Sequence, residues 1–271
     1  MPIVSAFLVP SSPLPYLKRD NKPWGKIAAG LESAGAALSQ SKPDVILLYS
    51  TQWIAVLDQL WQVKPRVSGI HVDENWHEYG ELPYKLRIDT RLAKACLAAT
   101  SKIGVRSKPV NYDGFPIDTG TIVATNFLNP GGAIPCVLTS NNLYHDFELT
   151  KKLGRLATNL AVAQKKRVSV VGVGNFSDTF FRHKIDITKD KISSQKYNRW
   201  NRKVLSMMEK GDVDDLAAAL PAFISQAKAE MGFKHAAWVL GALRGKFKGA
   251  HVHAYGPLYG SGGAVVEFIL K

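Results

Sequence analysis

Residues 44–53 read DVILLYSTQW, and this stretch indicates an α/β fold. Residues 45–49 form an apolar run typical of a strand that is buried on both faces. The run ends in a polar tripeptide, residues 50–52, and open α/β sheets place working side chains at the carboxyl ends of their strands. The sequence therefore predicts a buried strand that presents Gln52 at a ligand-binding edge of the sheet.

The segments around this strand predict a mostly parallel sheet. Ala6 to Val9 form a short first strand, and the apolar residues within 24–39 recur at helical spacing, which indicates a β-α-β unit. Val168 to Val173 is a continuous β-branched run, which favours a second buried parallel strand. Further strands are expected at residues 108–112 and 136–140, with an antiparallel hairpin of residues 251–255 and 264–270.

Helices are expected between these strands. Three prolines within residues 10–15 argue against a helix there, and Pro221 is expected to start a new helix that breaks near Gly232. No linker or repeat marks a second domain. The expected fold class is α/β, a single domain of residues 1–271 with a central mostly parallel sheet, flanking helices and a C-terminal hairpin. The expected helices are residues 24–39, 89–100, 146–164, 197–210, 213–219 and 221–243, with one more in the second half of residues 114–128.

Composition indicates an ordinary globular protein. The 271 residues are 46% hydrophobic with a mean hydropathy of −0.07, which excludes a disordered chain. The first nine residues lack a basic leader, and no apolar run has membrane-spanning length. The two cysteines, Cys96 and Cys136, form no CxxC pair, which argues against a disulfide scaffold or zinc site. We therefore expect a cytoplasmic protein with no membrane partner.

The net charge of +13 raises the question of a nucleic-acid partner. The basic residues do not cluster strongly, and the densest groups, residues 165–167, 198–203 and 244–248, resemble exposed helix ends or loops. No RNA-binding aromatic signature or helix-turn-helix pattern is present. Such groups are usually solvent-exposed charges without a specific role. An acidic protein partner would explain the excess of basic residues equally well. No nucleic-acid partner is expected.

The histidines offer no obvious mechanism. His71 and His77, with acidic residues between them, could in principle bind a metal, but no helix face brings them together. His251 and His253 share a strand face without a third ligand nearby in the sequence, and His235 is expected to pack or face solvent. The acidic residues between and beside the first pair are Asp73, Glu74 and Glu78.

Common catalytic and nucleotide-binding motifs are absent. There is no G-x-S-x-G nucleophile elbow and no P-loop lysine, and GVGNFS lacks the third glycine of a dinucleotide fingerprint. Polar residues at three strand ends, Ser11 and Ser12, Gln52, and Ser177 and Asp178, predict a polar crevice instead.

The order of the strand-end motifs resembles the class III extradiol ring-cleavage dioxygenases, the superfamily of protocatechuate 4,5-dioxygenase. The motifs are the proline-rich exit of the first strand, VILLYSTQW, IDTGT, GVGNFS, AEMG before WVLGAL, and the glycine-rich C-terminal hairpin. Together they cover almost the whole chain. The resemblance implies an α/β fold and an enzyme family that opens aromatic rings with O2.

Family members hold Fe(II) with two histidines and one glutamate, and a separate histidine acts as acid and base. Here the exit of the first strand contains Ser11 and Ser12 but no histidine, and Gln52 stands where the second histidine would lie. Glu230 in AEMG matches the glutamate. The resemblance thus implies that these are vestigial metal positions and that the chain holds no metal or cofactor.

Two further family positions have also changed. Asp178 replaces the acid/base histidine after Ser177, and Thr119 replaces a pocket histidine or tyrosine before Gly120. With Gln52 they are vestigial catalytic positions, so no catalytic residue is expected in this chain.

Such losses resemble the non-catalytic α subunits of two-component members that open 2-aminophenol to 2-aminomuconic 6-semialdehyde. The resemblance implies an oxidoreductase complex, an α2β2 heterotetramer, in which a homologous β subunit carries the Fe(II). Two alternatives stay open. In the first, the chain is a stand-alone enzyme that reuses the crevice through Asp178, Glu230 and Ser12. In the second, it is a binding protein without a catalytic partner.

Overall fold

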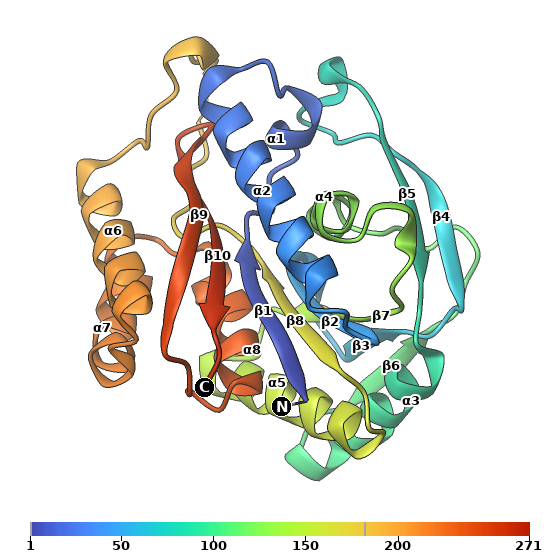
Figure 1. The fold of residues 1–271 in the computed structure, drawn as a ribbon. Helices are drawn as coiled ribbons and strands as arrows, with labels where there is room; N and C mark the ends of the chain where they lie inside the picture. Colours follow the sequence, from blue (N-terminus) through green and yellow to red (C-terminus); the bar gives the residue numbers. More distant parts are fainter. Residues whose placement is uncertain (1, 182) are drawn as a thin grey trace.

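The centre of the molecule is an eight-stranded sheet in the order β6-β3-β7-β2-β8-β1-β10-β9 (Figure 1). This computed structural model describes residues 2–181 and 183–271. A separate two-stranded antiparallel sheet joins β4 and β5. The strands are β1 Ile3–Val9, β2 Val45–Ala55, β3 Gln59–Gln62, β4 Arg66–His71, β5 Leu82–Arg87, β6 Ser107–Val110, β7 Cys136–Asn142, β8 Val168–Val173, β9 Gly249–Leu258 and β10 Ser261–Ile269.

The four central strands β7, β2, β8 and β1 are parallel, and both β8 and β7 are buried along their whole length. Strands covered on both faces are typically apolar, as β8 is, whereas the polar side chains of Thr139 and Asn141 in β7 form hydrogen bonds. The hairpin β9–β10 adds to β1 in antiparallel direction. The predicted single α/β domain with a mostly parallel sheet and a C-terminal hairpin is confirmed.

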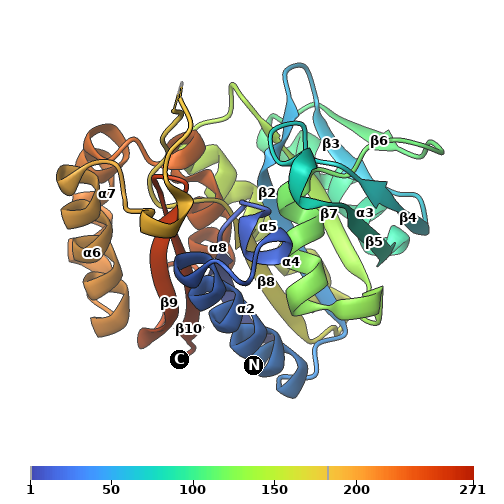
Figure 2. The ribbon, with the colours of Figure 1, turned by 90° about the horizontal axis from the view of Figure 1, so that it is seen from above.

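Helices cover both faces of this sheet. Helices α2 and α4 pack together on one face, and α5 and α8 pack together on the other, as Figure 2 shows. Helices α6 and α7 pair beside the hairpin. The α-helices are α1 Leu14–Leu17, α2 Lys22–Gln40, α3 Thr90–Ala99, α4 Thr119–Leu128, α5 Phe147–Ala163, α6 Gln195–Lys210, α7 Val213–Gln226 and α8 Lys234–Ala242. Short 3₁₀ turns are η1 His77–Tyr79, η2 Thr100–Ile103, η3 Pro130–Gly132, η4 Ile187–Lys189 and η5 Glu230–Phe233.

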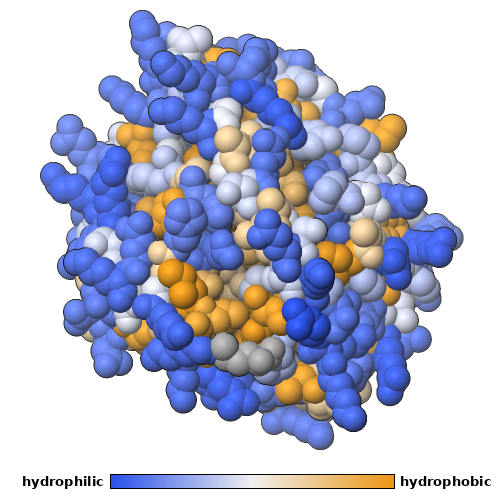
Figure 3. Space-filling model, in the orientation of Figure 1, coloured by the Kyte–Doolittle hydropathy of each residue, from blue (hydrophilic) through white to orange (hydrophobic). Residues whose placement is uncertain are grey.

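The face of the molecule seen in Figure 3 is mainly hydrophilic. Figure 3 shows hydrophilic side chains spread over the whole visible face, with apolar groups gathered below its centre. None of the helices within residues 2–181 and 183–271 combines the length and apolar character needed to cross a membrane.

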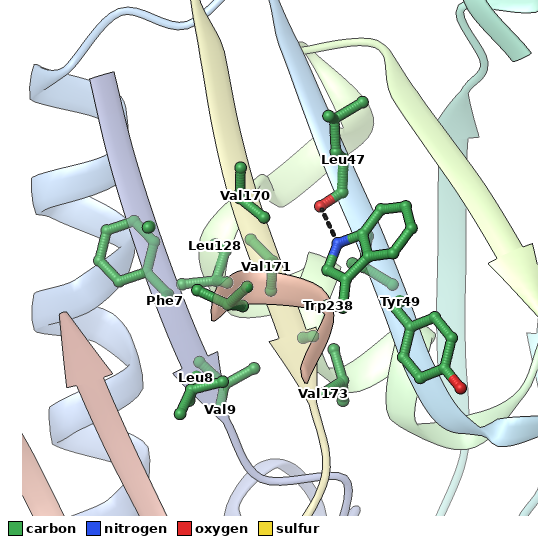
Figure 4. Close-up of a cluster of buried hydrophobic side chains, with 14 of the residues drawn as sticks. Phe7, Leu8, Val9, Leu47, Tyr49, Leu128, Val170, Val171, Val173 and Trp238 are labelled. Atoms are coloured by element: carbon green, nitrogen blue, oxygen red, sulfur yellow. Dashed lines mark hydrogen bonds between the residues drawn. The ribbon is translucent and has the colours of Figure 1, made fainter. Parts of the chain in front are cut away.

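The core lies on both faces of the parallel strands, and Figure 4 shows the part that includes Trp238 of α8. The Trp238 ring stacks on Tyr49 with ring centroids 5.7 Å apart, and its Nε1 donates to the Leu47 carbonyl oxygen at 3.3 Å. That hydrogen bond satisfies the indole N–H, so the ring can be fully buried against β2.

Three local predictions were wrong. Residues 14–17 form α1 despite the prolines, because Pro13 caps this helix and Pro15 lies in its first turn, where no backbone N–H is needed. Pro221 lies inside α7 instead of starting a helix, and it is exposed, so water can satisfy the carbonyl oxygen that loses its partner. Strand β2 continues to Ala55, because residues 54 and 55 pair with β7 after an irregularity.

Candidate functional site

A cavity of about 1170 Å³ opens at the carboxyl ends of β1, β2 and β8, the upper end of the sheet in Figure 1. Its walls include the loop after β4, the N-terminus of α4, and the segment that follows β8. The predicted polar crevice is therefore present. Of the predicted site residues, Ser12, Gln52, Thr119, Asp178 and Glu230 line this cavity.

Glu230 is a buried carboxylate in this wall, with only 7% of its surface exposed. Its oxygens accept hydrogen bonds from the Ser11 hydroxyl at 3.0 and 3.2 Å, from the Asn175 backbone N–H at 3.0 Å, and from the Thr51 hydroxyl. Burial, and to a lesser extent the nearby Asp178 carboxylate, raise the pKa of Glu230 to about 7, although its hydrogen bonds oppose the change. Glu230 therefore exchanges its proton near neutral pH.

A strained turn brings Glu230 to this place. Met231 and Phe233 in η5 adopt φ angles of 47° and 59°, a region that side chains with a Cβ rarely occupy. The turn directs Glu230 inward while Met231 remains 39% exposed.

Gln52 faces the cavity from β2, and its Oε1 accepts a hydrogen bond from the Gly120 N–H at 2.8 Å. Neighbouring side chains of a strand point to opposite faces, and Thr51 accordingly turns to Glu230 while Gln52 turns to α4. A Cβ on Gly120 would lie only 3.2 Å from Oε1 of Gln52. Because glycine has no side chain, α4 can approach β2 this closely. Gln52 is thus a tie between β2 and α4.

Asp178 and Thr119 have separate partners. Asp178 accepts hydrogen bonds from the Ser261 hydroxyl at 3.0 Å and the Thr179 N–H at 2.9 Å. Burial raises the pKa of Asp178, and these hydrogen bonds partly oppose that effect. The Thr119 hydroxyl contacts His71, at 2.8 Å from Nε2.

His235 and His253 do not line this cavity. His235 is fully buried, packed against Phe233 at a centroid distance of 4.8 Å, which confirms the packed option. His253 Nε2 lies 2.9 Å from a Glu267 oxygen on the neighbouring strand β10. Sequence analysis did not identify Glu267 as a partner of His253, because the two residues come together only when β9 pairs with β10.

The match to known proteins agrees with this architecture. A family model described as the catalytic LigB subunit of aromatic ring-opening dioxygenase matches residues 6–267. The chain belongs to the LigB family.

Among LigB relatives, the chain is 50% identical over 269 residues to a 2-aminophenol 1,6-dioxygenase alpha subunit from Pseudomonas, covering 99% of both chains. It is 26% identical to a 2-aminophenol 1,6-dioxygenase beta subunit from Pseudomonas, covering 99% of this chain and 94% of that one. An uncharacterized protein of Escherichia coli K12 shares the fold, with a TM-score of 0.65 at 13% identity and coverage of 97% and 99%.

The iron site implied by the LigB resemblance does not fit the residues present. Around Glu230 the neighbours are the hydroxyls of Ser11 and Thr51 and a backbone N–H, which donate to its oxygens instead of leaving them to a cation. The amide of Gln52 is a weak neutral ligand, and it already accepts from Gly120. Within residues 2–181 and 183–271 no histidine hydrogen-bonds or ion-pairs with Glu230.

Sequence reasoning missed two parts of the site. It assigned no role to Thr51 or to the Asn175 backbone, although both hold Glu230. Alternation along β2 could have suggested Thr51, since it must face away from Gln52. The hydrogen bond from the Asn175 N–H to Glu230 depends on the backbone conformation after β8, which no sequence pattern predicts.

Proposed function

We propose that this chain is the non-catalytic α subunit of a two-component extradiol dioxygenase. The complex opens 2-aminophenol to 2-aminomuconic 6-semialdehyde with O2, and a homologous β subunit carries the Fe(II). Residues 1–271 act as one dioxygenase-like domain in an α2β2 assembly in the cytoplasm.

One observation carries the proposal. Glu230, the single carboxylate retained from the family's ligand set, is held by hydroxyls and a backbone N–H, and no histidine in the described part of the chain hydrogen-bonds or ion-pairs with it. Identity of 50% across 99% of a chain named as an alpha subunit supports the same conclusion. Ser11, Ser12 and Gln52 are vestigial metal positions, and Gln52, Thr119 and Asp178 are vestigial catalytic positions.

The residues of this crevice therefore have a supporting role. Gln52 joins β2 to α4, and Glu230 joins the exits of β1, β2 and β8 through Ser11, Thr51 and Asn175. Such ties keep the strand ends ordered, so the surface around the crevice has one shape to offer a partner.

A stand-alone enzyme remains the second candidate, because Glu230 and Asp178 both have raised pKa values and line one large cavity. Paired carboxyl groups of this kind can act as acid and base. In this function the cavity of the chain itself would turn over a substrate, with Ser12 in its wall.

Co-expression with a β subunit separates the two candidates. The chains are expected to co-purify, and the complex should open 2-aminophenol, followed by the absorbance of the ring-cleavage product, while this chain alone should not. Glu230→Gln and Asp178→Asn in this chain should leave turnover by the complex unchanged. Turnover by the isolated chain that these substitutions abolish would support the stand-alone enzyme instead.

A further inference from the structure

A second cluster of ligand-type side chains lies in another part of the cavity wall. One ring nitrogen of His71 and one carboxylate oxygen each of Asp73 and Glu74 lie within 4.8 Å of one another. His71 ends β4, and the two acidic residues follow in the loop to η1. All three line the cavity, so an ion from solvent can reach them.

The fold brings together a different group from the one the sequence suggested. The pair considered from sequence was His71 with His77, but His77 lies in η1 and is absent from the cluster. Residues 71, 73 and 74 lie where β4 ends and a turn over residues 74–76 begins. One imidazole and two carboxylates result.

Thr119 positions two of these ligands from the other side of the cavity wall. Its hydroxyl donates to Asp73 Oδ2 at 3.0 Å and lies 2.8 Å from His71 Nε2. A hydroxyl has one hydrogen, so the donor in the second contact is the Nε2–H of His71. In that tautomer the lone pair of Nδ1 is available to a metal ion. A metal-binding histidine usually donates its other ring N–H to a neighbouring acceptor, as Nε2–H does here to the Thr119 hydroxyl.

Asp73 is also fixed before any ion binds. It is 7% exposed, and its Oδ1 accepts from the backbone N–H groups of Asn75 at 2.9 Å and Trp76 at 3.2 Å. Each carboxylate oxygen can accept more than one contact, so lone pairs remain for a cation. Glu74 is exposed and can turn toward a bound ion.

We propose that His71, Asp73 and Glu74 bind one divalent first-row transition cation. A ligand set of one imidazole and two carboxylates suits Mn²⁺ or Zn²⁺ better than Ca²⁺ or Mg²⁺, which prefer oxygen alone. The ion ties the loop after β4 to the N-terminus of α4 through Thr119. This site is separate from the vestigial ligand positions around Glu230, with which it shares no residue.

The test is metal titration of the isolated, chelator-treated chain. Mn²⁺ is followed by the loss of the electron paramagnetic resonance signal of the free ion, and Zn²⁺ by calorimetry. We expect one ion per chain. His71→Ala and Glu74→Gln should each weaken binding at least about 10-fold, and Thr119→Val, which replaces the hydroxyl with a methyl group, by roughly 10-fold or more.

Matched controls come from the same loop. His77→Ala and Glu78→Gln remove the same chemical types outside the cluster and should leave the affinity unchanged, as should Glu230→Gln. Glu74 is exposed, so its substitution leaves folding intact, which thermal unfolding would check. Absence of saturable one-to-one binding, binding that survives His71→Ala and Glu74→Gln together, or binding lost in Glu230→Gln would each overturn the proposal. The readout involves no ring cleavage, so it is independent of the proposed function.

Discussion

Glu230 is a carboxylate that the fold buries among neutral donors. Its hydrogen bonds to Ser11, Thr51 and Asn175 satisfy the oxygens, but within the described part of the chain no cationic side chain pairs with it. Hydrogen bonds from neutral groups offset only part of the cost of burying a charge. The charged form therefore destabilises the folded state, and the proton is retained to higher pH.

The pKa of Glu230 predicts how stability depends on pH. Its value of about 7 in the folded chain lies above its ordinary value of 4.5, so between these values the folded state keeps a proton that the unfolded state releases. Stability then falls as pH rises through this window, by on the order of 3 kcal/mol at most. Glu230→Gln removes this dependence, because an amide does not ionise.

Urea unfolding of wild type and Glu230→Gln at pH 5 and pH 8 checks this prediction. The variant should gain stability relative to wild type as the pH rises, since its amide can still bond to the hydroxyls of Ser11 and Thr51. Glu148→Gln, at an exposed glutamate, should run parallel to wild type. Parallel profiles for the Glu230 variant too would show that Glu230 ionises with an ordinary pKa.

Helices α5 and α8 cross at very short range, and two glycines permit it. A Cβ on Gly154 in α5 would meet the backbone of Trp238, and a Cβ on Gly241 in α8 would meet the backbone of Lys151. Neither neighbour can move as a side chain could. The approach places Trp238 over β2, where its ring stacks on Tyr49.

Gly154→Ala is therefore expected to destabilise the protein. Alanine is worth about 1 kcal/mol more than glycine in a helix, but forcing the two helices apart costs about 1–3 kcal/mol or more, so the net change is a loss. Chemical denaturation gives the difference in unfolding free energy. Gly256→Ala is the matched control, since its new Cβ would meet Ile27 at an ordinary 3.6 Å. Equal stabilities for the two variants would contradict close α5–α8 packing.

Across the whole molecule, the charge of +13 affects how the chain meets a partner. A net charge of this size acts at long range on an oppositely charged partner. We expect an acidic β subunit, with association steered by charge and the final complex held mainly by apolar contacts.

Increasing salt concentration should therefore slow assembly without dissociating the complex. Stopped-flow mixing of separately purified subunits at increasing ionic strength is expected to show a falling association rate constant, while gel filtration shows the complex intact at every salt concentration. Uncharged sucrose at matched viscosity serves as the control for diffusion. An association rate that ignores ionic strength would mean that charge has no part in the encounter.

The amino-acid sequence by itself determined the mostly parallel sheet, most of the helices and the crevice. Apolar runs such as Val168–Val173 and helical spacing within residues 24–39 report local burial, and local burial follows from side-chain hydrophobicity alone. Polar residues at strand ends, Gln52 and Asp178 among them, were placed in one cavity because parallel strands end at one edge.

Only the tertiary structure decided which groups touch. Thr51 and Ser11 meet Glu230 across separations of 179 and 219 residues, and Thr119 meets His71 across 48. No periodic pattern encodes such contacts, since they depend on strand register, on the turn of η5, and on how closely α4 approaches β2. For the same reason the His71, Asp73 and Glu74 cluster became visible only when the chain was folded: three side chains form one site only where the backbone converges.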